Sequence, residues 1–227
     1  MMRKVIGIAA ALLLSGCNMV MSEQPWFAAG DAAQPGMKDG LWVNLKGGDC
    51  KFDPAEAIQD WPDCAQPMLV SGGQYRGPGP GADEDKGQLA DVAKWDKVDH
   101  LLVAGDPLID QIDLTSGNPD GSHADGKGFL YLAVRALRRD ELGLIVEVLR
   151  WPVACGPLPK RSPKAKGMPK ASDFVTRQPF AGLKIKDAAC TAVDTAALRR
   201  AAVLSEAVAE PNHTPPLVSR WVRDTSP

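Results

Sequence analysis

The sequence predicts an α+β fold, in which a mostly antiparallel, curled β-sheet carries one C-terminal helix packed on it and is held by two disulfides. Short apolar segments that alternate with polar residues at the period of a strand recur along the chain. The 22 glycines and 19 prolines favour frequent turns over long helices. Only residues 190–210 have the apolar spacing of an amphipathic helix. We expect a single disulfide-stapled, β-rich domain over residues 39–227.

Four strand candidates occupy the first half of this domain, each bounded by glycine, proline or a polar loop. Residues 50–64, with a short helix near 54–57, and residues 77–87 are predicted as loops between them. A longer turn-rich loop is predicted over 114–128. The strand candidates are, in order, GLWVNL (40–45), PMLVSGGQYRG (67–77, with a bulge at its two glycines), KVDHLLVAG (97–105) and PLIDQIDL (107–114). The last two are either separate strands or one strand broken at residues 105–107.

The clearest local signal is a β-hairpin made by FLYLAVRAL (129–137) and LIVEVLRW (144–151). Apolar residues alternate along one face of both strands. If residues 140–142 form a three-residue turn, Arg135 lies opposite Glu147, and such a pair stabilises a sheet by under about 1 kcal/mol. Aromatic side chains beside a charge pair fit either a structural pair or a ligand cleft. The candidate binding residues of this face are Tyr131, Arg135, Glu147 and Trp151.

The one predicted helix is CTAVDTAALRRAAVLSEAVAE, over residues 190–210. Thr191 and Asp194 resemble a capping box, with Asp in place of the usual Glu or Gln, and Pro211 ends the helix. A last strand is expected over residues 217–224. The apolar side of the helix is predicted to consist of Val193, Ala197, Ala201, Leu204 and Val208.

Composition and charge exclude few classes of protein. The chain is 44% hydrophobic and 24% charged, with a formal net charge of −2, so nothing in the global charge favours nucleic acid as a partner. The only sustained apolar run, residues 5–14, is shorter than the roughly 20 residues that span a bilayer as a helix.

The first residues have the order of an export signal. Arg3 and Lys4 are positive, residues 5–14 are apolar, and Leu14-Ser15-Gly16-Cys17 follows. This arrangement resembles the lipobox signal peptide of bacterial lipoproteins. The resemblance implies removal of residues 1–16, a diacylglycerol thioether on Cys17, and acylation, for example with palmitate, of the new amino terminus. Two or more acyl chains anchor a protein stably.

The same resemblance implies a location. Asn18 follows Cys17 where Asp would retain a Gram-negative lipoprotein in the inner membrane, so we expect the outer membrane, with the protein facing the periplasm. Residues 18–38 are rich in Ala, Gly, Gln and Met, so 17–38 is predicted to be a lipidated N-terminus and flexible tether. The mature domain resembles uncharacterised envelope lipoproteins.

Lipidation of Cys17 leaves four cysteines, an even number that favours two disulfides in an oxidising envelope. Three connectivities are possible, and we favour Cys50–Cys64 with Cys155–Cys190. A zinc site is the rival interpretation, but it usually shows closely spaced cysteine pairs, which are missing from this sequence.

Catalytic and cofactor signatures are scarce. The sequence has no G-x-S-x-G, P-loop, H-E-x-x-H or dinucleotide-binding motif, and we expect no cofactor. His100 neighbours Asp99 in a strand candidate, so the two point to opposite faces, and His123 and His213 fall in loops. Residues 118–126 offer oxygens for calcium but lack the EF-hand order, and they also suit ordinary turns.

A proline-rich basic loop, GPLPKRSPKAKGMPK, is the remaining candidate contact surface. Its binding candidates Lys160, Arg161 and Lys164, followed by Lys166 and Lys170, suit anionic headgroups or envelope polymers, although a solvated loop has the same composition. The sequence therefore predicts a non-enzymatic binding or assembly module, with a membrane and an envelope polymer or protein as partners. The alternative is a glycan-acting hydrolase that uses a sheet carboxylate such as Glu147.

Overall fold

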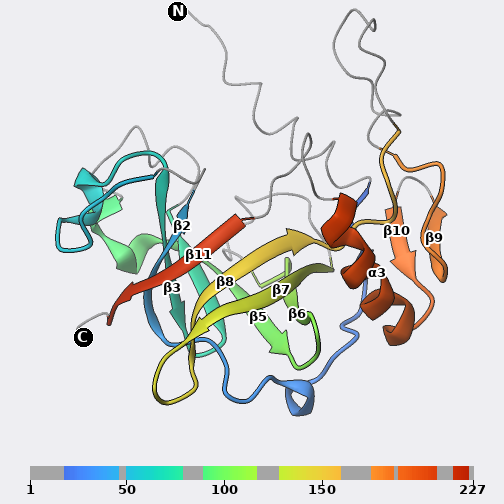
Figure 1. Ribbon diagram of the computed structural model, residues 1–227, viewed down its shortest axis with the longest axis horizontal. Coiled ribbons are helices and arrows are strands. Elements are labelled where there is room, and N and C mark those ends of the chain that lie inside the picture. The colour runs from blue at the N-terminus through green and yellow to red at the C-terminus, as the bar shows by residue number, and fades with distance from the viewer. Residues whose placement is uncertain are drawn as a thin grey trace, which may run out of the picture.

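The computed structural model describes residues 18–45, 50–78, 89–116, 128–159, 175–186, 189–208 and 217–224. Eleven strands, three 3-10 turns and one α-helix lie in these ranges (Figure 1). Their bounds are β1 (Met21–Ser22), η2 (Ala29–Asp31), β2 (Gly40–Leu45), η3 (Ile58–Asp60), β3 (Ala65–Ser71), β4 (Gln74–Gly77), η4 (Val92–Lys94), β5 (Asp96–Val103), β6 (Leu108–Asp113), β7 (Phe129–Arg139), β8 (Ile145–Pro152), β9 (Leu183–Lys186), β10 (Ala189–Ala192), α3 (Thr195–Val208) and β11 (Leu217–Arg223).

Eight strands close into an antiparallel barrel. Strands β2 to β8 form a meander in which each strand pairs with the next, and β11 fits between β8 and β2. The short β1 pairs with the first residues of β7, beyond the end of β8. The predicted antiparallel sheet is thus confirmed, but it is a fully closed barrel rather than a curled sheet, because the last strand supplies partners for both remaining edges.

Alternation along the strands produces two apolar layers on β7 and β8. Val134 and Val148 point into the barrel, whereas Ala133 and Trp151 point outward beneath α3 and the β9–β10 hairpin. Both faces of these strands are therefore buried, which explains why the hairpin is apolar on both sides. A third cluster, around Trp61 and Trp95, covers the outer face of β2 and β3.

The β-hairpin of β7 and β8 and the single helix confirm the sequence predictions in outline. Residues 67–77, however, are not one bulged strand: they belong to β3 and β4, which turn at Gly72 and Gly73. Both glycines have positive φ, as a tight hairpin turn requires.

Helix α3 is shorter than predicted, because residues 189–192 form strand β10 instead. Asp194 is itself the cap: its Oδ1 accepts from Ala197 N at 2.6 Å, so the predicted box with Thr191 is wrong. Val193 and Leu204 are about half exposed. The buried side carries smaller residues, which let the helix approach the barrel closely: Ala197, Leu198, Ala201, Ala202 and Ser205.

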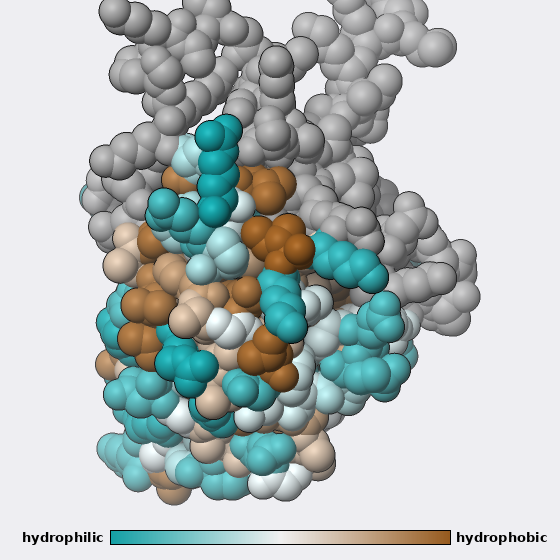
Figure 2. Space-filling model, turned by 90° about the vertical axis from the view of Figure 1, so that its right-hand side faces the viewer, coloured by the Kyte–Doolittle hydropathy of each residue, from teal (hydrophilic) through white to brown (hydrophobic). Residues whose placement is uncertain are grey.

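Figure 2 looks onto this side of the molecule, where apolar and hydrophilic side chains are mixed over the surface. Among the residues that the structure describes, no helix is long and apolar enough to cross a membrane.

Residues 18–38 are packed against the barrel, in contrast to the flexible tether that their composition predicts. Val20 and Phe27 are buried in the cluster beneath α3. Further along, Ala33 N donates to Leu102 O at 2.7 Å and Lys38 N donates to Ile145 O at 2.9 Å. Apolar side chains scattered through an Ala- and Gly-rich segment are enough to fix it.

Both predicted disulfides are present, Cys50–Cys64 and Cys155–Cys190. The first closes a loop of the chain between β2 and β3, and the second joins the end of β8 to β10. The four sulfurs are therefore not zinc thiolates.

Candidate functional site

Four polar side chains meet inside the barrel, and we call them the polar cluster: Tyr75 of β4, His100 of β5, Asp110 of β6 and Arg150 of β8. The Tyr75 hydroxyl donates to Oδ2 of Asp110 at 2.6 Å, and Nδ1 of His100 lies 2.9 Å from Oδ1 of the same carboxylate. Nη2 of Arg150 donates to the Tyr75 hydroxyl oxygen at 3.1 Å. A continuous set of hydrogen bonds thus joins four strands across the interior.

The rings of the polar cluster also stack. The ring centroids of Tyr75 and His100 are 3.6 Å apart, with 15° between their planes. The Arg150 guanidinium lies 4.7 Å from the Tyr75 ring centroid, on the distance scale of a cation–π contact. Asp110 is fully buried, and these neighbours supply the charge and hydrogen bonds that a buried carboxylate requires.

The cluster fixes the protonation of two of its members. Burial favours a higher pKa for Asp110, but the charge and hydrogen bond of His100, then Arg150 and the Tyr75 hydroxyl, outweigh it and hold that pKa below its usual value. Burial raises the pKa of Tyr75 well above its usual value, opposed by Arg150 and reinforced by Asp110. At neutral pH, Asp110 is therefore an anion and Tyr75 a neutral hydroxyl donor.

Arg150 is 6% exposed and has unusual neighbours. Its Nη2 also approaches Sδ of Met37 at 3.3 Å, and its Nη1 approaches Sδ of Met68 at 3.8 Å. Thioether sulfurs are weak acceptors, and Nε of Arg150 is buried without a hydrogen-bond partner among the described residues. The guanidinium is thus held mainly by Tyr75 and by the charge of Asp110.

A cavity of about 610 Å³ extends from the other part of the barrel interior to its rim, because outward-facing residues such as Ala65 and Lys97 line it as well. It lies toward the end where the connections between strands are long, which we call the long-loop end. Inward-facing side chains of four strands line its apolar part, Met68, Val98, Ile112 and Leu130. Asn44 and Gln66 contribute amide groups, and Trp61, Pro62 and Leu89 come from the connections after β2 and β4.

Tyr75 and Met68 form the boundary between the cavity and the polar cluster. Both line the cavity, and both contact the Arg150 guanidinium on their other side. A bound molecule would therefore rest on an aromatic ring and a flexible thioether, with the charged groups behind them. Met side chains adapt readily to the shape of an apolar partner.

Charged side chains also line the cavity. Arg76 of β4 is the register partner of Lys97 of β5, and both contribute to the lining. Like charges in directly opposite positions repel each other, so this pair is unfavourable unless an anion lies nearby. Asp63 and Asp96 line the same cavity. The polar part of the lining thus carries both signs of charge around an apolar interior.

The residues predicted from the hairpin do not form a cleft. Tyr131 and Trp151 are core residues: the Tyr131 hydroxyl lies 2.6 Å from Ser22 Oγ, and Nε1 of Trp151 donates to Ala202 O of α3 at 3.0 Å. Arg135 pairs with Glu206 of α3 and not with Glu147.

The predicted register fails because the turn spans residues 140–144 and not 140–142, so that Leu149 lies opposite Arg135. A bulge after Ala136 places Glu147 opposite Arg138. Glu147 instead forms ion pairs with Arg138 at 3.3 Å and Arg220 at 3.2 Å. A carboxylate in two ion pairs between strands has a structural role, so this geometry lends no support to a hydrolase built on Glu147.

Several other predicted sites lie outside the described residues: Cys17, His123, His213, the possible calcium loop over 118–126, and Lys160, Arg161 and Lys164 of the basic loop. Within the described ranges, no group of three or more His, Cys, Asp and Glu side chains is placed to hold a metal ion.

Sequence reasoning missed the polar cluster, although a signal was present. His100 and Asp110 each interrupt the apolar alternation of their strands at an inward position, between Val98 and Leu102 and between Leu108 and Ile112. Polar residues at such positions indicate a buried network.

Comparisons with known proteins add no assignment, since no protein-family model, curated protein or solved structure matches this chain.

Proposed function

We propose that this chain is a lipid-anchored binding protein of the bacterial envelope, whose barrel cavity holds one small, predominantly apolar molecule. The anchor and the location at the outer membrane follow from the lipobox-like sequence that ends at Cys17. The binding role follows from the barrel interior, and the two parts are tested separately.

The observation that carries the binding role is the hollow long-loop end of the barrel. Eight-stranded barrels are either filled by their own side chains or hold one small ligand. Protein interiors are otherwise close-packed, with few voids larger than a water molecule. A cavity of about 610 Å³, apolar within and lined by a few amide and charged groups, has the size and chemistry of a small-molecule site.

The polar cluster supports binding over catalysis. The Tyr75 hydroxyl donates to Asp110 and accepts from Arg150, so its hydrogen-bonding capacity is used within the protein. Asp110 has both carboxylate oxygens occupied, by Tyr75 and His100. Groups that satisfy one another hold the strands and the floor of the cavity in place rather than acting on a substrate.

A fluorescence titration of the mature protein with N-phenyl-1-naphthylamine, a small apolar probe, tests the binding role. We expect saturable binding of one probe per chain. Val98→Trp fills the cavity from within and should weaken binding by at least about tenfold, or about 1.4 kcal/mol. Leu142→Trp, at a position 81% exposed in the β7–β8 turn, is the matched control and should bind as the unaltered protein does.

Two results would count against this proposal. One is the absence of saturable binding to a protein that is folded by circular dichroism. The other is equal affinity in the Val98→Trp variant and in the unaltered protein, which would place the probe elsewhere.

A further inference from the structure

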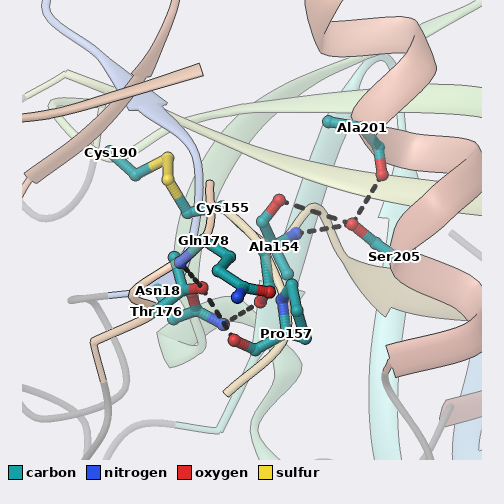
Figure 3. Close-up of a disulfide and its surroundings, with 10 residues drawn as sticks. Asn18, Ala154, Cys155, Pro157, Thr176, Gln178, Cys190, Ala201 and Ser205 are labelled. Atoms are coloured by element: carbon teal, nitrogen blue, oxygen red, sulfur yellow. Dashed lines mark hydrogen bonds between the residues drawn. A yellow bond between two sulfur atoms is a disulfide. The ribbon is translucent and has the colours of Figure 1, made fainter. Parts of the chain in front are cut away.

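Asn18, one residue after the proposed lipidation site, is fixed to the folded domain. Its Nδ2 donates to Gly156 O at 3.0 Å, and its carbonyl accepts from Cys155 N at 2.7 Å. The following residues continue the attachment: Met19 bridges Ala154, and Val20, which is fully buried, bridges Cys190. Figure 3 shows Asn18 beside the Cys155–Cys190 disulfide.

This attachment leaves almost no free chain between the anchor and the domain. The Cα atoms of Cys17 and Asn18 are about 3.8 Å apart, as in any trans peptide. A flexible tether over 17–38 would have had a root-mean-square length of about 25 Å. A lipid on Cys17 would thus be one residue away from the part of the chain that is fixed to the domain, which would hold the domain close to the bilayer.

The surface around Asn18 is suited to a lipid surface. We call it the anchor corner, and it consists of Asn18 with residues 155–159 and 175–180. The two segments are joined by a hydrogen bond from the Thr176 hydroxyl to Pro157 O at 2.7 Å. Their sequences, CGPLP and VTRQPF, contain one charged residue, Arg177, which is exposed. The described part of this surface, with prolines and apolar side chains, one cation and no carboxylate, complements an interface of lipid headgroups.

We propose that the folded domain lies directly on the membrane, with the anchor corner in contact with the lipid surface. This inference rests on the lipidation of Cys17 that the proposed function includes. A flexible tether, in contrast, would hold the domain away from the bilayer.

The contact also brings the cavity to the membrane. Met21, four residues after Cys17, is the register partner of Leu130, which lines the cavity. Four residues span at most about 14 Å. The long-loop end of the barrel is therefore on the membrane side, and an apolar ligand passes between bilayer and cavity without crossing a wide aqueous gap.

Hydrogen exchange of the full lipidated protein in vesicles of phosphatidylethanolamine and phosphatidylglycerol tests this proposal. The comparison variant carries about twenty Gly and Ser residues between Cys17 and Asn18, enough for a tether of about 25 Å. Amides of the anchor corner should exchange about tenfold more slowly in the natural protein than in this variant. The matched control carries the same insertion between Glu141 and Leu142 and should keep the slow exchange.

Equal exchange of the anchor corner in the natural protein and in the linker variant would overturn the proposal. The intact mass of each sample separates this outcome from failure of the anchor itself. A mass with acyl chains on Cys17 and no protection refutes only the membrane contact, whereas a mass without acyl chains refutes the anchor and the contact together. The cavity is tested independently by the probe titration.

Discussion

The two ends of the barrel are built from the same strands but are closed in different ways. At the short-turn end, the turns at 72–73, 104–107 and 140–144 are compact, and residues 31–38 cross the opening. Ala33 and Met37 of this segment pack into the barrel core. At the long-loop end, the interior holds the cavity. Among the described residues, the barrel interior is thus packed at the short-turn end and holds the cavity at the long-loop end.

The polar cluster lies between the packed end of the barrel and the end that holds the cavity. On one side, Arg150 touches Met37, which belongs to the segment that closes the short-turn end. On the other side, Tyr75 forms the floor of the cavity. The polar cluster thus separates the packed half of the barrel from the half that holds the cavity.

The largest expected effect on stability comes from Asp110→Asn, which removes the only carboxylate of the polar cluster. Arg150 would remain buried with its charge uncompensated, so we expect a loss of about 3–5 kcal/mol in the free energy of unfolding. Urea denaturation measures the loss. Asp99→Asn, at an exposed position of the same hairpin, is the matched control and should change the stability by less than about 0.5 kcal/mol. Equal, small losses in both variants would mean that the cluster does not hold the barrel.

A pair of leucine truncations compares the two ends directly. Leu102 is 7% exposed and its carbonyl accepts from Ala33 at the filled end, whereas Leu130 lines the cavity. Leu102→Ala should cost about 3 kcal/mol, because it opens a void in packed surroundings. Leu130→Ala should cost about 1 kcal/mol, because its neighbours are already loosely packed on one side. Equal costs, measured by the same denaturation, would show that the long-loop end is as well filled as the other.

Tyr75→Phe removes the only hydroxyl of the polar cluster and keeps the aromatic ring that lines the cavity. The lost hydrogen bonds should lower the stability by about 1–2 kcal/mol at pH 7. The variant also tests the raised pKa of Tyr75. In the unfolded chain the Tyr75 hydroxyl ionises near pH 10, whereas in the folded protein its pKa is higher. The contribution of the neutral hydroxyl to the free energy of unfolding is therefore fully present below about pH 10 and is lost as the pH rises through the folded pKa.

The substitution should therefore weaken the alkaline loss of stability. Tyr131→Phe is the comparison: burial also raises the pKa of Tyr131, but less than that of Tyr75, so this substitution should weaken the alkaline loss of stability to a smaller extent. If stability falls equally above about pH 10 with and without Tyr75→Phe, the raised pKa of Tyr75 is contradicted.

The smallest expected effect is on how the stability difference between the unaltered protein and Asp110→Asn depends on acidic pH. The pKa of Asp110 is held below its usual value, so its contribution to stability is present above the unfolded pKa of about 3.9 and is lost as the pH falls through the folded pKa. The difference in stability between the unaltered protein and Asp110→Asn should therefore narrow as the pH falls below about 4. A difference that stays constant or widens in acid would mean that the carboxylate is not stabilised as an anion.

Local features of this fold were predictable from the sequence, because short-range patterns determine them. The β7–β8 hairpin and strand β2 follow from alternation and turn residues, and the number of disulfides follows from the cysteine count. The observed pairing is the favoured one of three possible connectivities. The closure of the barrel did not follow, because β11 pairs with β2 across more than 170 positions of the chain. Alternation shows that a strand has an inner face but not which strand lies beside it.

The candidate site was harder to predict for the same reason. The polar cluster combines residues of four strands, whereas the carboxylate next to His100 in the sequence is that of Asp99, which points to the opposite face. Its actual partner, Asp110, lies on the next strand, diagonally across the register in which His100 pairs with Ile112. The order of residues 18–38 was missed because their composition is that of a linker, while Val20, Phe27 and Ala33 are buried.

The most direct test of the hollow end is a set of intermolecular nuclear Overhauser effects between N-phenyl-1-naphthylamine and the methyl groups of the protein. Binding in the cavity predicts contacts to Val98, Ile112 and Leu130, and none to Val134 or Val148 beyond the polar cluster. Contacts confined to exposed side chains of α3, such as Val203 and Leu204, or no contacts at saturating probe, would contradict the account of this barrel as a binding protein.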